Sequence, residues 1–179
     1  MAVSQFEGRL ANLVNAGFPY LFIPSYEEDR VVGAIVRTLE NPELVKARRK
    51  VYTWTQTQGL VCDGNRVKDT AQPVPAIDYI GRSSEDAVFI LKDFHVYFGG
   101  ERNSRPDHMV IRKLRDILPN LKSSRKTVVF LSPQLAIPGD MEKEISVLDF
   151  PLPAMEEIEA TLNELTEGLS PESIRLTPE

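Results

Sequence analysis

The sequence comprises 179 residues, 42% of them hydrophobic and 26% charged, which is the composition of an ordinary globular protein with room for one domain. The net charge of −5 argues against general binding to nucleic acid, and no stretch approaches the roughly 18 consecutive apolar residues that predict a membrane span. The single cysteine, Cys62, excludes an internal disulfide and is typical of the reducing cytoplasm.

Helical and strand patterns alternate along the chain. Short runs rich in β-branched and aromatic residues predict strands, and apolar residues that recur every three or four positions predict helices. In chain order, these patterns predict a helix over 6–16, a strand over 20–23, a helix over 25–39, a strand over 51–55, a short helix over 75–80, a strand over 87–91, a helix over 107–122, a strand over 127–131, a helical turn over 141–144, a strand over 145–148 and a helix over 154–167. Because crossovers of this length join parallel strands, we expect a three-layer α/β/α domain with a five-stranded, mainly parallel sheet.

Three local patterns refine these boundaries. Ser25 and Glu28 have the spacing of a capping box, which predicts that the second helix starts there. The polar segment 56–75 contains an Asp-Gly-Asn turn that fits a hairpin. In the helix over 107–122, Asp107 is the expected N-cap. The expected apolar stripe of that helix comprises Met109, Ile111, Leu114, Ile117, Leu118 and Leu121.

The strand over 87–91 is fully apolar and is followed closely by Asp93. A carboxylate at the carboxyl end of a central parallel strand lies where open α/β sheets bind ligands, and P-loop ATPases build their Mg²⁺-orienting acidic motif in this way. On a strand, Asp93 and His95 would face the same side and reach one ligand. Two ligands are too few for a structural zinc site, so a hydrogen-bonded strand end is the favoured interpretation.

The segment after the first predicted strand lacks the features of a phosphate-binding loop. Such a loop needs glycines for close backbone approach and a lysine for charge, whereas residues 24–29 contain neither and place three carboxylates in the first helical turn. Each suits the helix dipole by about 0.3–1 kcal/mol, but together they repel a nucleotide by on the order of a few kcal/mol. We therefore expect a degenerate nucleotide site without metal or catalytic residues. Its positions are Pro24, Ser25, Tyr26, Glu27, Glu28, Asp93, His95 and Ser132.

A basic stretch over 112–126 is the candidate anion-binding surface. Its four candidate contacts are Arg112, Arg115, Arg125 and Lys126, and phosphate binding there would depend on salt. No aromatic residues interleave these charges, so a solvated helix face is favoured over a nucleic-acid site.

Taken together, the motifs resemble those of an ATPase of the AAA class. Their order is a strand leading into a helix at Ile23–Glu28, an acidic motif at Phe89–His95, a sensor-like strand at Val128–Pro133 and a strand-to-lid-helix junction at Leu148–Glu159. Four phrases look more closely like the N-terminal region of AAA ATPases encoded in cyanobacterial and plastid genomes as hypothetical chloroplast frames, relatives of CbbX-type Rubisco activases. These phrases are Phe22–Arg30, Trp54–Leu60, Leu121–Thr127 and Glu142–Pro153.

The resemblance implies a degenerate, AAA-like P-loop domain over residues 1–167 and a linker over 168–179 toward an ATPase module that this chain lacks. ATP and Mg²⁺ are expected only in that module. The implied role is non-catalytic: recognition of protein partners, or assembly and regulation of the ATPase, with its own ATPase module, other proteins and a homo-oligomer as the expected partners. It also implies a cytoplasmic or stromal location and a link to photosynthesis or inorganic-carbon use. The alternative is a metal-dependent hydrolase or nucleotide-binding enzyme that uses Asp93 with Glu27 or Glu28.

Overall fold

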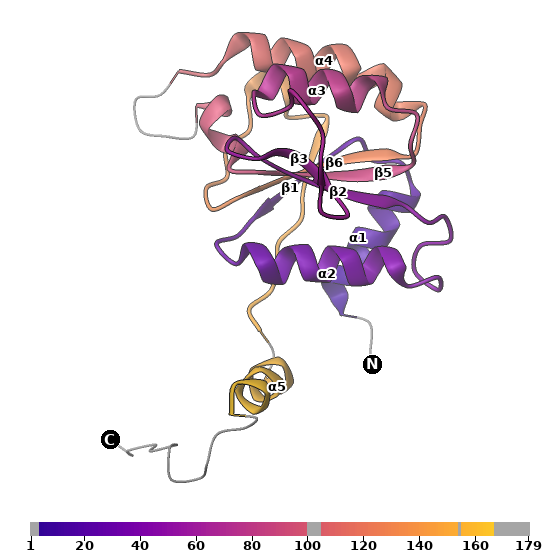
Figure 1. The fold of residues 1–179 in the computed structure, drawn as a ribbon, viewed down its shortest axis with the longest axis vertical. Coiled ribbons are helices and arrows are strands. Elements are labelled where there is room, and N and C mark those ends of the chain that lie inside the picture. Colours follow the sequence, from indigo (N-terminus) through magenta and orange to yellow (C-terminus); the bar gives the residue numbers. More distant parts are fainter. Residues whose placement is uncertain (1–3, 100–104, 154, 167–179) are drawn as a thin grey trace.

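The computed structural model describes residues 4–99, 105–153 and 155–166 as three layers, with helices on both faces of one sheet (Figure 1). The elements are α1 (Gln5–Asn15), β1 (Tyr20–Pro24), α2 (Glu28–Glu40), β2 (Lys50–Thr55), β3 (Gly59–Cys62), β4 (Asn65–Arg66), α3 (Pro73–Arg82), β5 (Ala87–Lys92), the 3₁₀ helix η1 (Phe94–Phe98), α4 (His108–Lys122), β6 (Lys126–Ser132), the 3₁₀ helix η2 (Gly139–Met141), β7 (Ile145–Val147) and α5 (Met155–Thr166). The predicted three-layer α/β fold is confirmed, and the expected linker over 168–179 lies outside the described residues.

The sheet has seven strands in the order β4-β3-β2-β5-β6-β1-β7. The five predicted strands pair in parallel, and the polar segment after β2 forms the hairpin that adds β3 and β4 as antiparallel edge strands. A sheet of this kind gathers the carboxyl ends of β1, β5 and β6 along one edge, because these three strands are adjacent and point the same way.

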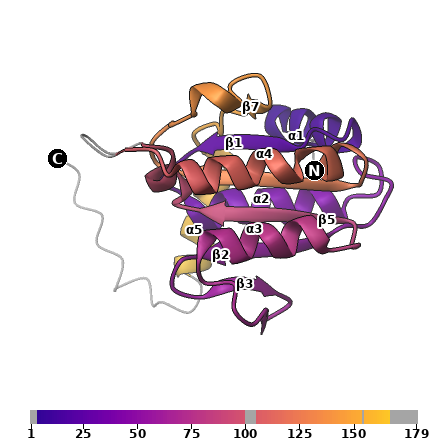
Figure 2. The same cartoon turned by 90° about the horizontal axis from the view of Figure 1, so that it is seen from above.

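Each face of the sheet has its own core. Helices α1 and α2 cover one face, and α3 and α4 cover the other (Figures 1 and 2). Successive residues of β5 alternate between the two: Phe89 and Leu91 join the core under α3 and α4, whereas Val88 and Ile90 join the core under α1 and α2. This two-sided burial explains why the strand reads as an unbroken apolar run.

The capping box predicted at Ser25 and Glu28 is wrong. Helix α2 begins at Glu28, and its N-cap Glu27 makes no side-chain capping hydrogen bond. The Ser25 amide donates to the carbonyl of Ser132 at 3.0 Å, which keeps the chain in the sheet one residue longer. A capping box does exist at the start of α1, between Ser4 and Glu7.

The apolar stripe of α4 differs from the prediction at its first turn. Asp107 is the N-cap, and its carboxylate accepts from the amides of Met109 and Val110. The cap orients that turn so that Val110 is buried while Met109 is 67% exposed. None of the helices in the described part of the chain is long and apolar enough to cross a bilayer.

Candidate functional site

The carboxyl edge of the sheet brings together the ends of β1, β5 and β6. Two backbone hydrogen bonds tie these ends together beyond the strands, from Ser25 N to Ser132 O at 3.0 Å and from Asp93 N to Leu131 O at 2.9 Å. The structure therefore places three of the predicted site residues, Ser25, Asp93 and Ser132, at one edge.

The connection between β1 and α2 is only three residues long, from 25 to 27. A loop of this length cannot fold around phosphate groups as a P-loop does, because that wrapping takes several consecutive glycine-rich residues. Pro24 also lacks the backbone donor that such a loop would use. The Tyr26 side chain projects into solvent and is 83% exposed.

The acidic residues at the start of α2 are held by basic partners. The Glu27 carboxylate lies 2.6 Å from the Arg30 guanidinium, whose hydrogen bonds lower the pKa of Glu27. Glu28 pairs with Lys92 at the end of β5, with 2.7 Å between Oε2 and Nζ. The positive end of the helix thus faces carboxylates rather than a free anion site, and the lysine at this edge is already neutralised.

The expectation that Asp93 and His95 share one face of a strand is wrong. Strand β5 ends at Lys92, Asp93 has a left-handed backbone with φ of 55°, and residues 94–98 turn into a 3₁₀ helix. The turn buries Phe94 and Phe98 against Phe130. Asp93 remains exposed, whereas His95 is buried, so these two side chains do not form the pair that strand geometry suggested.

The alternative of a metal site finds little support in this arrangement. Glu27 and Glu28 are engaged by Arg30 and Lys92, and within the described residues no group of three or more potential metal ligands comes together. The Nδ1 of His95 and the Oγ of Ser132 are buried without a hydrogen-bond partner among the described residues.

Lys126 does not belong to an anion-binding surface. Only 2% of the residue is exposed. Its ammonium group donates to the carbonyls of Ile80, Gly81 and Ser83 at 3.0, 3.3 and 2.7 Å and to Asn120 Oδ1 at 2.5 Å. Burial lowers the pKa of Lys126. The lysine is therefore a structural cation that satisfies the carboxyl end of α3.

The three arginines predicted beside it are exposed, and each has an acidic partner. Arg112 pairs with Asp116 on its own helix. Arg115 lies 3.4 Å from Asp140, and Arg125 lies 3.4 Å from Asp86. These pairings favour the interpretation of α4 as a solvated helix face.

Sequence reasoning missed Arg30, which fastens the segment that leaves β7. Its guanidinium lies 4.1 Å from the centre of the Phe150 ring and donates to the carbonyl of Pro151 at 2.5 Å. Phe150 in turn packs edge-on against Phe6 with 4.8 Å between ring centres. The only signal in the sequence was the spacing of Glu27 and Arg30, which places both on one side of the first turn.

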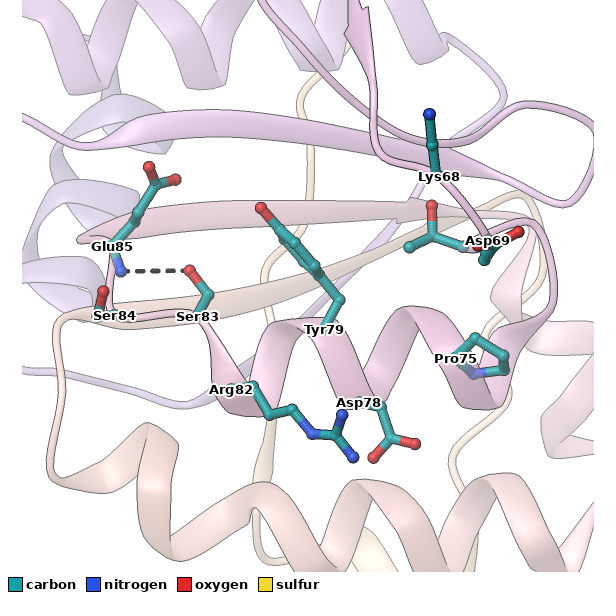
Figure 3. Close-up of a pocket in the computed structure, with 10 residues that line it drawn as sticks. Lys68, Asp69, Pro75, Asp78, Tyr79, Arg82, Ser83, Ser84 and Glu85 are labelled. Carbon is teal, nitrogen blue, oxygen red and sulfur yellow. Dashed lines mark hydrogen bonds between the residues drawn. The ribbon is translucent and has the colours of Figure 1, made fainter.

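A pocket of about 560 Å³ lies between α3 and the segment that follows β4 (Figure 3). Two of its carboxylates are already paired: Asp78 with Lys113 at 2.5 Å, and Glu85 with Lys50 at 2.5 Å and with the Tyr52 hydroxyl. The bonds from Lys50 and Tyr52 lower the pKa of Glu85. This wall of the pocket is a satisfied network rather than a set of poised catalytic groups.

The parallel core and the helices on both faces define a P-loop-like fold. A chain of the solved HORMA:CdnC:Trip13 complex of E. coli MS115-1 has the same fold, with a TM-score of 0.56 at 12% identity over 96% of this chain and 70% of that one. The chain belongs to the family described as the SpoVK-like AAA ATPase N-terminal domain, whose model matches residues 6–150.

Curated relatives carry the same domain within longer proteins. The uncharacterized AAA domain-containing protein ycf46 of Guillardia theta is 30% identical over 161 residues, covering 88% of this chain and 29% of that protein. The ycf46 protein of Trieres chinensis is 29% identical over 169 residues, covering 93% and 32%. These relatives are plastid-encoded, and this chain spans less than a third of their length.

Proposed function

We propose that this domain is a non-catalytic protein-contact module that serves partner recognition or assembly of the AAA ATPase to which it belongs. The proposal includes a location in the cytoplasm or plastid stroma, and a link to photosynthesis or inorganic-carbon use through the plastid-encoded relatives. ATP and Mg²⁺ would bind the ATPase module and not this domain.

The main support for the proposal is that the carboxyl edge of the sheet lacks a phosphate-binding loop. At the position of a phosphate-binding loop the chain has a three-residue connection that begins after a proline, and the adjacent lysine, Lys92, is bound to Glu28. A triphosphate would have to displace that ion pair and approach the carboxylates of Glu27, Glu28 and Asp29. Repulsion of this kind costs on the order of a few kcal/mol, which lowers affinity by two or more factors of ten.

The direct test measures phosphate release and thermal stability of the purified chain with Mg·ATP. We expect no turnover above the protein-free control, and no rise in Tm at millimolar nucleotide, because only a ligand that binds the folded state stabilises it. Steady turnover, or a Tm that rises with nucleotide concentration, would overturn the non-catalytic assignment.

A variant and its matched control test whether the acidic turn is what prevents nucleotide from binding at this edge. In the double variant Glu28→Gln/Asp29→Asn, two charges that oppose a nucleotide are removed while the side-chain shapes stay the same. If this variant gains a nucleotide-dependent rise in Tm that the parent chain lacks, the acidic turn is what closes the site. The matched control, Glu142→Gln/Asp149→Asn, removes two exposed charges outside this turn and is expected to behave like the parent.

A further inference from the structure

An apolar groove lies beside α2, where the sheet extends beyond the helices that cover it. The core under α1 and α2 takes its strand residues from β1, β5 and β6, whereas Val51 on β2 is only partly buried against it. The groove has a volume of about 650 Å³ and is lined by Val32 and Val36 of α2, Val51 of β2 and Val61 of β3. All four valines are half-buried, so apolar surface remains open to solvent there.

The rim of this groove is basic. Lys46 and Arg48 line it, both are exposed, and neither forms an ion pair with any residue that the structure describes. Lys50 also lines the groove but is bound to Glu85. The lining also includes Arg49, which is buried and donates to the carbonyls of Val14 and Arg125, and the carboxylates of Glu40 and Asp63. The groove therefore offers an apolar floor with two cations at its edge that pair with none of the described residues.

Helix α5 has the complementary character. Met155, Ile158 and Leu162 are 67%, 41% and 55% exposed, and their spacing of three and four residues puts them on one face of the helix. The sequence Met155–Thr166 contains four glutamates and no lysine or arginine. It is an acidic amphipathic helix about 18 Å long, and Figure 1 shows it apart from the body of the domain, beyond the layer of α1 and α2.

We propose that the groove beside α2 receives helix α5 of a second copy of this chain. The apolar stripe would cover the valine floor, and the negative charge of the helix would lie near Lys46 and Arg48. A helix lying in an apolar groove is a common mode of protein recognition, read through residues at this spacing. Charge complementarity would set its orientation and make the contact sensitive to salt.

The segment between β7 and α5 favours docking of α5 in the groove of a second copy over docking in the groove of the same chain. Arg30 holds Phe150 and Pro151 at the amino-terminal end of α2, and the prolines at 151 and 153 restrict the backbone before the helix begins. The groove instead runs along α2 from Val32 to Glu40 and continues into residues 42–49 beyond the carboxyl end of that helix. Such a contact is head-to-tail, so copies can add in a ring or a chain. The inference rests on the assembly role proposed above.

The test measures self-association of the full chain by sedimentation velocity over a range of concentrations. We expect association that weakens as salt rises, and at least a tenfold loss of affinity in either of two variants: Lys46→Glu/Arg48→Glu in the groove, or Ile158→Asp/Leu162→Asp in the helix. The matched control, Arg105→Glu/Lys143→Glu, makes the same charge change at two exposed residues outside the groove and is expected to associate like the parent.

Mixing the two defective variants tests whether α5 of one copy binds the groove of another. Each retains the half that the other lacks, so an equimolar mixture is expected to form a heterodimer through one intact groove and one intact helix. Failure of the mixture to associate, or a parent chain that stays monomeric at every concentration, would overturn the inference. Neither result depends on nucleotide, so the test can fail while the non-catalytic assignment stands, and the reverse also holds.

Discussion

Lys126, the buried first residue of β6 whose ammonium group binds the carboxyl end of α3, gives the sharpest prediction on stability. Replacing Lys126 by methionine keeps most of the side-chain volume but removes the ammonium group that satisfies three carbonyls and Asn120. Removing one partner from a buried charged network costs about 3–5 kcal/mol, and the energy of taking the charge out of water offsets part of that. We therefore expect Lys126→Met to lower the free energy of unfolding by about 3 kcal/mol, a large share of the 5–15 kcal/mol typical of a domain.

Urea denaturation followed by the fluorescence of Trp54 measures this change, since Trp54 is the single tryptophan and is buried in the core under α3. The matched control is Lys122→Met, which removes an exposed lysine at the end of α4 that pairs with Glu144. It should cost less than about 1 kcal/mol. If Lys126→Met were within about 0.5 kcal/mol of the parent, the structural role assigned to Lys126 would be wrong.

Three further predictions follow from the geometry. Gly59→Ala should destabilise the hairpin by more than about 1 kcal/mol in urea denaturation, because φ is +73° and the new Cβ would lie 2.7 Å from Thr70 Oγ1; a neutral result would contradict the tight contact. The pKa of Glu27 is lowered by Arg30, so Glu27→Gln should cost less than about 1 kcal/mol at neutral pH, and that cost should vanish as pH falls through the folded pKa; a cost that persists at pH 2 would argue against the ion pair. Arg30→Ala should speed cleavage of the Asp149–Phe150 bond by a protease that cuts after acidic residues, since the segment around Phe150 and Pro151 loses its contacts with Arg30; an unchanged cleavage rate would show that Arg30 does not hold this segment.

The fold was predictable because the amino-acid composition of the strand segments identifies them as strands. The apolar run of β5 is buried on both faces, and alternation with helices then demands a parallel sheet. Even the hairpin was signalled by its Asp-Gly turn, where Asp63 and Gly64 both take positive φ.

The site residues were harder to predict, because they depend on contacts between distant segments. The sequence pattern predicted Ser25 as a helix cap, yet its amide donates to the carbonyl of Ser132, more than a hundred residues away. Lys126 was predicted to be exposed in a basic stretch, yet its ammonium group is buried and donates to three carbonyls around the end of α3. Asp93 leaves the strand because the aromatic residues that follow pack on Phe130.

Isothermal titration calorimetry of this chain with Mg·ADP and Mg·ATP tests the central claim most directly. We expect no binding heat above that of dilution, because the acidic turn and the Glu28–Lys92 pair occupy the place of a phosphate-binding loop. A saturating isotherm with a micromolar dissociation constant would show that the site still binds nucleotide, and the account would fail.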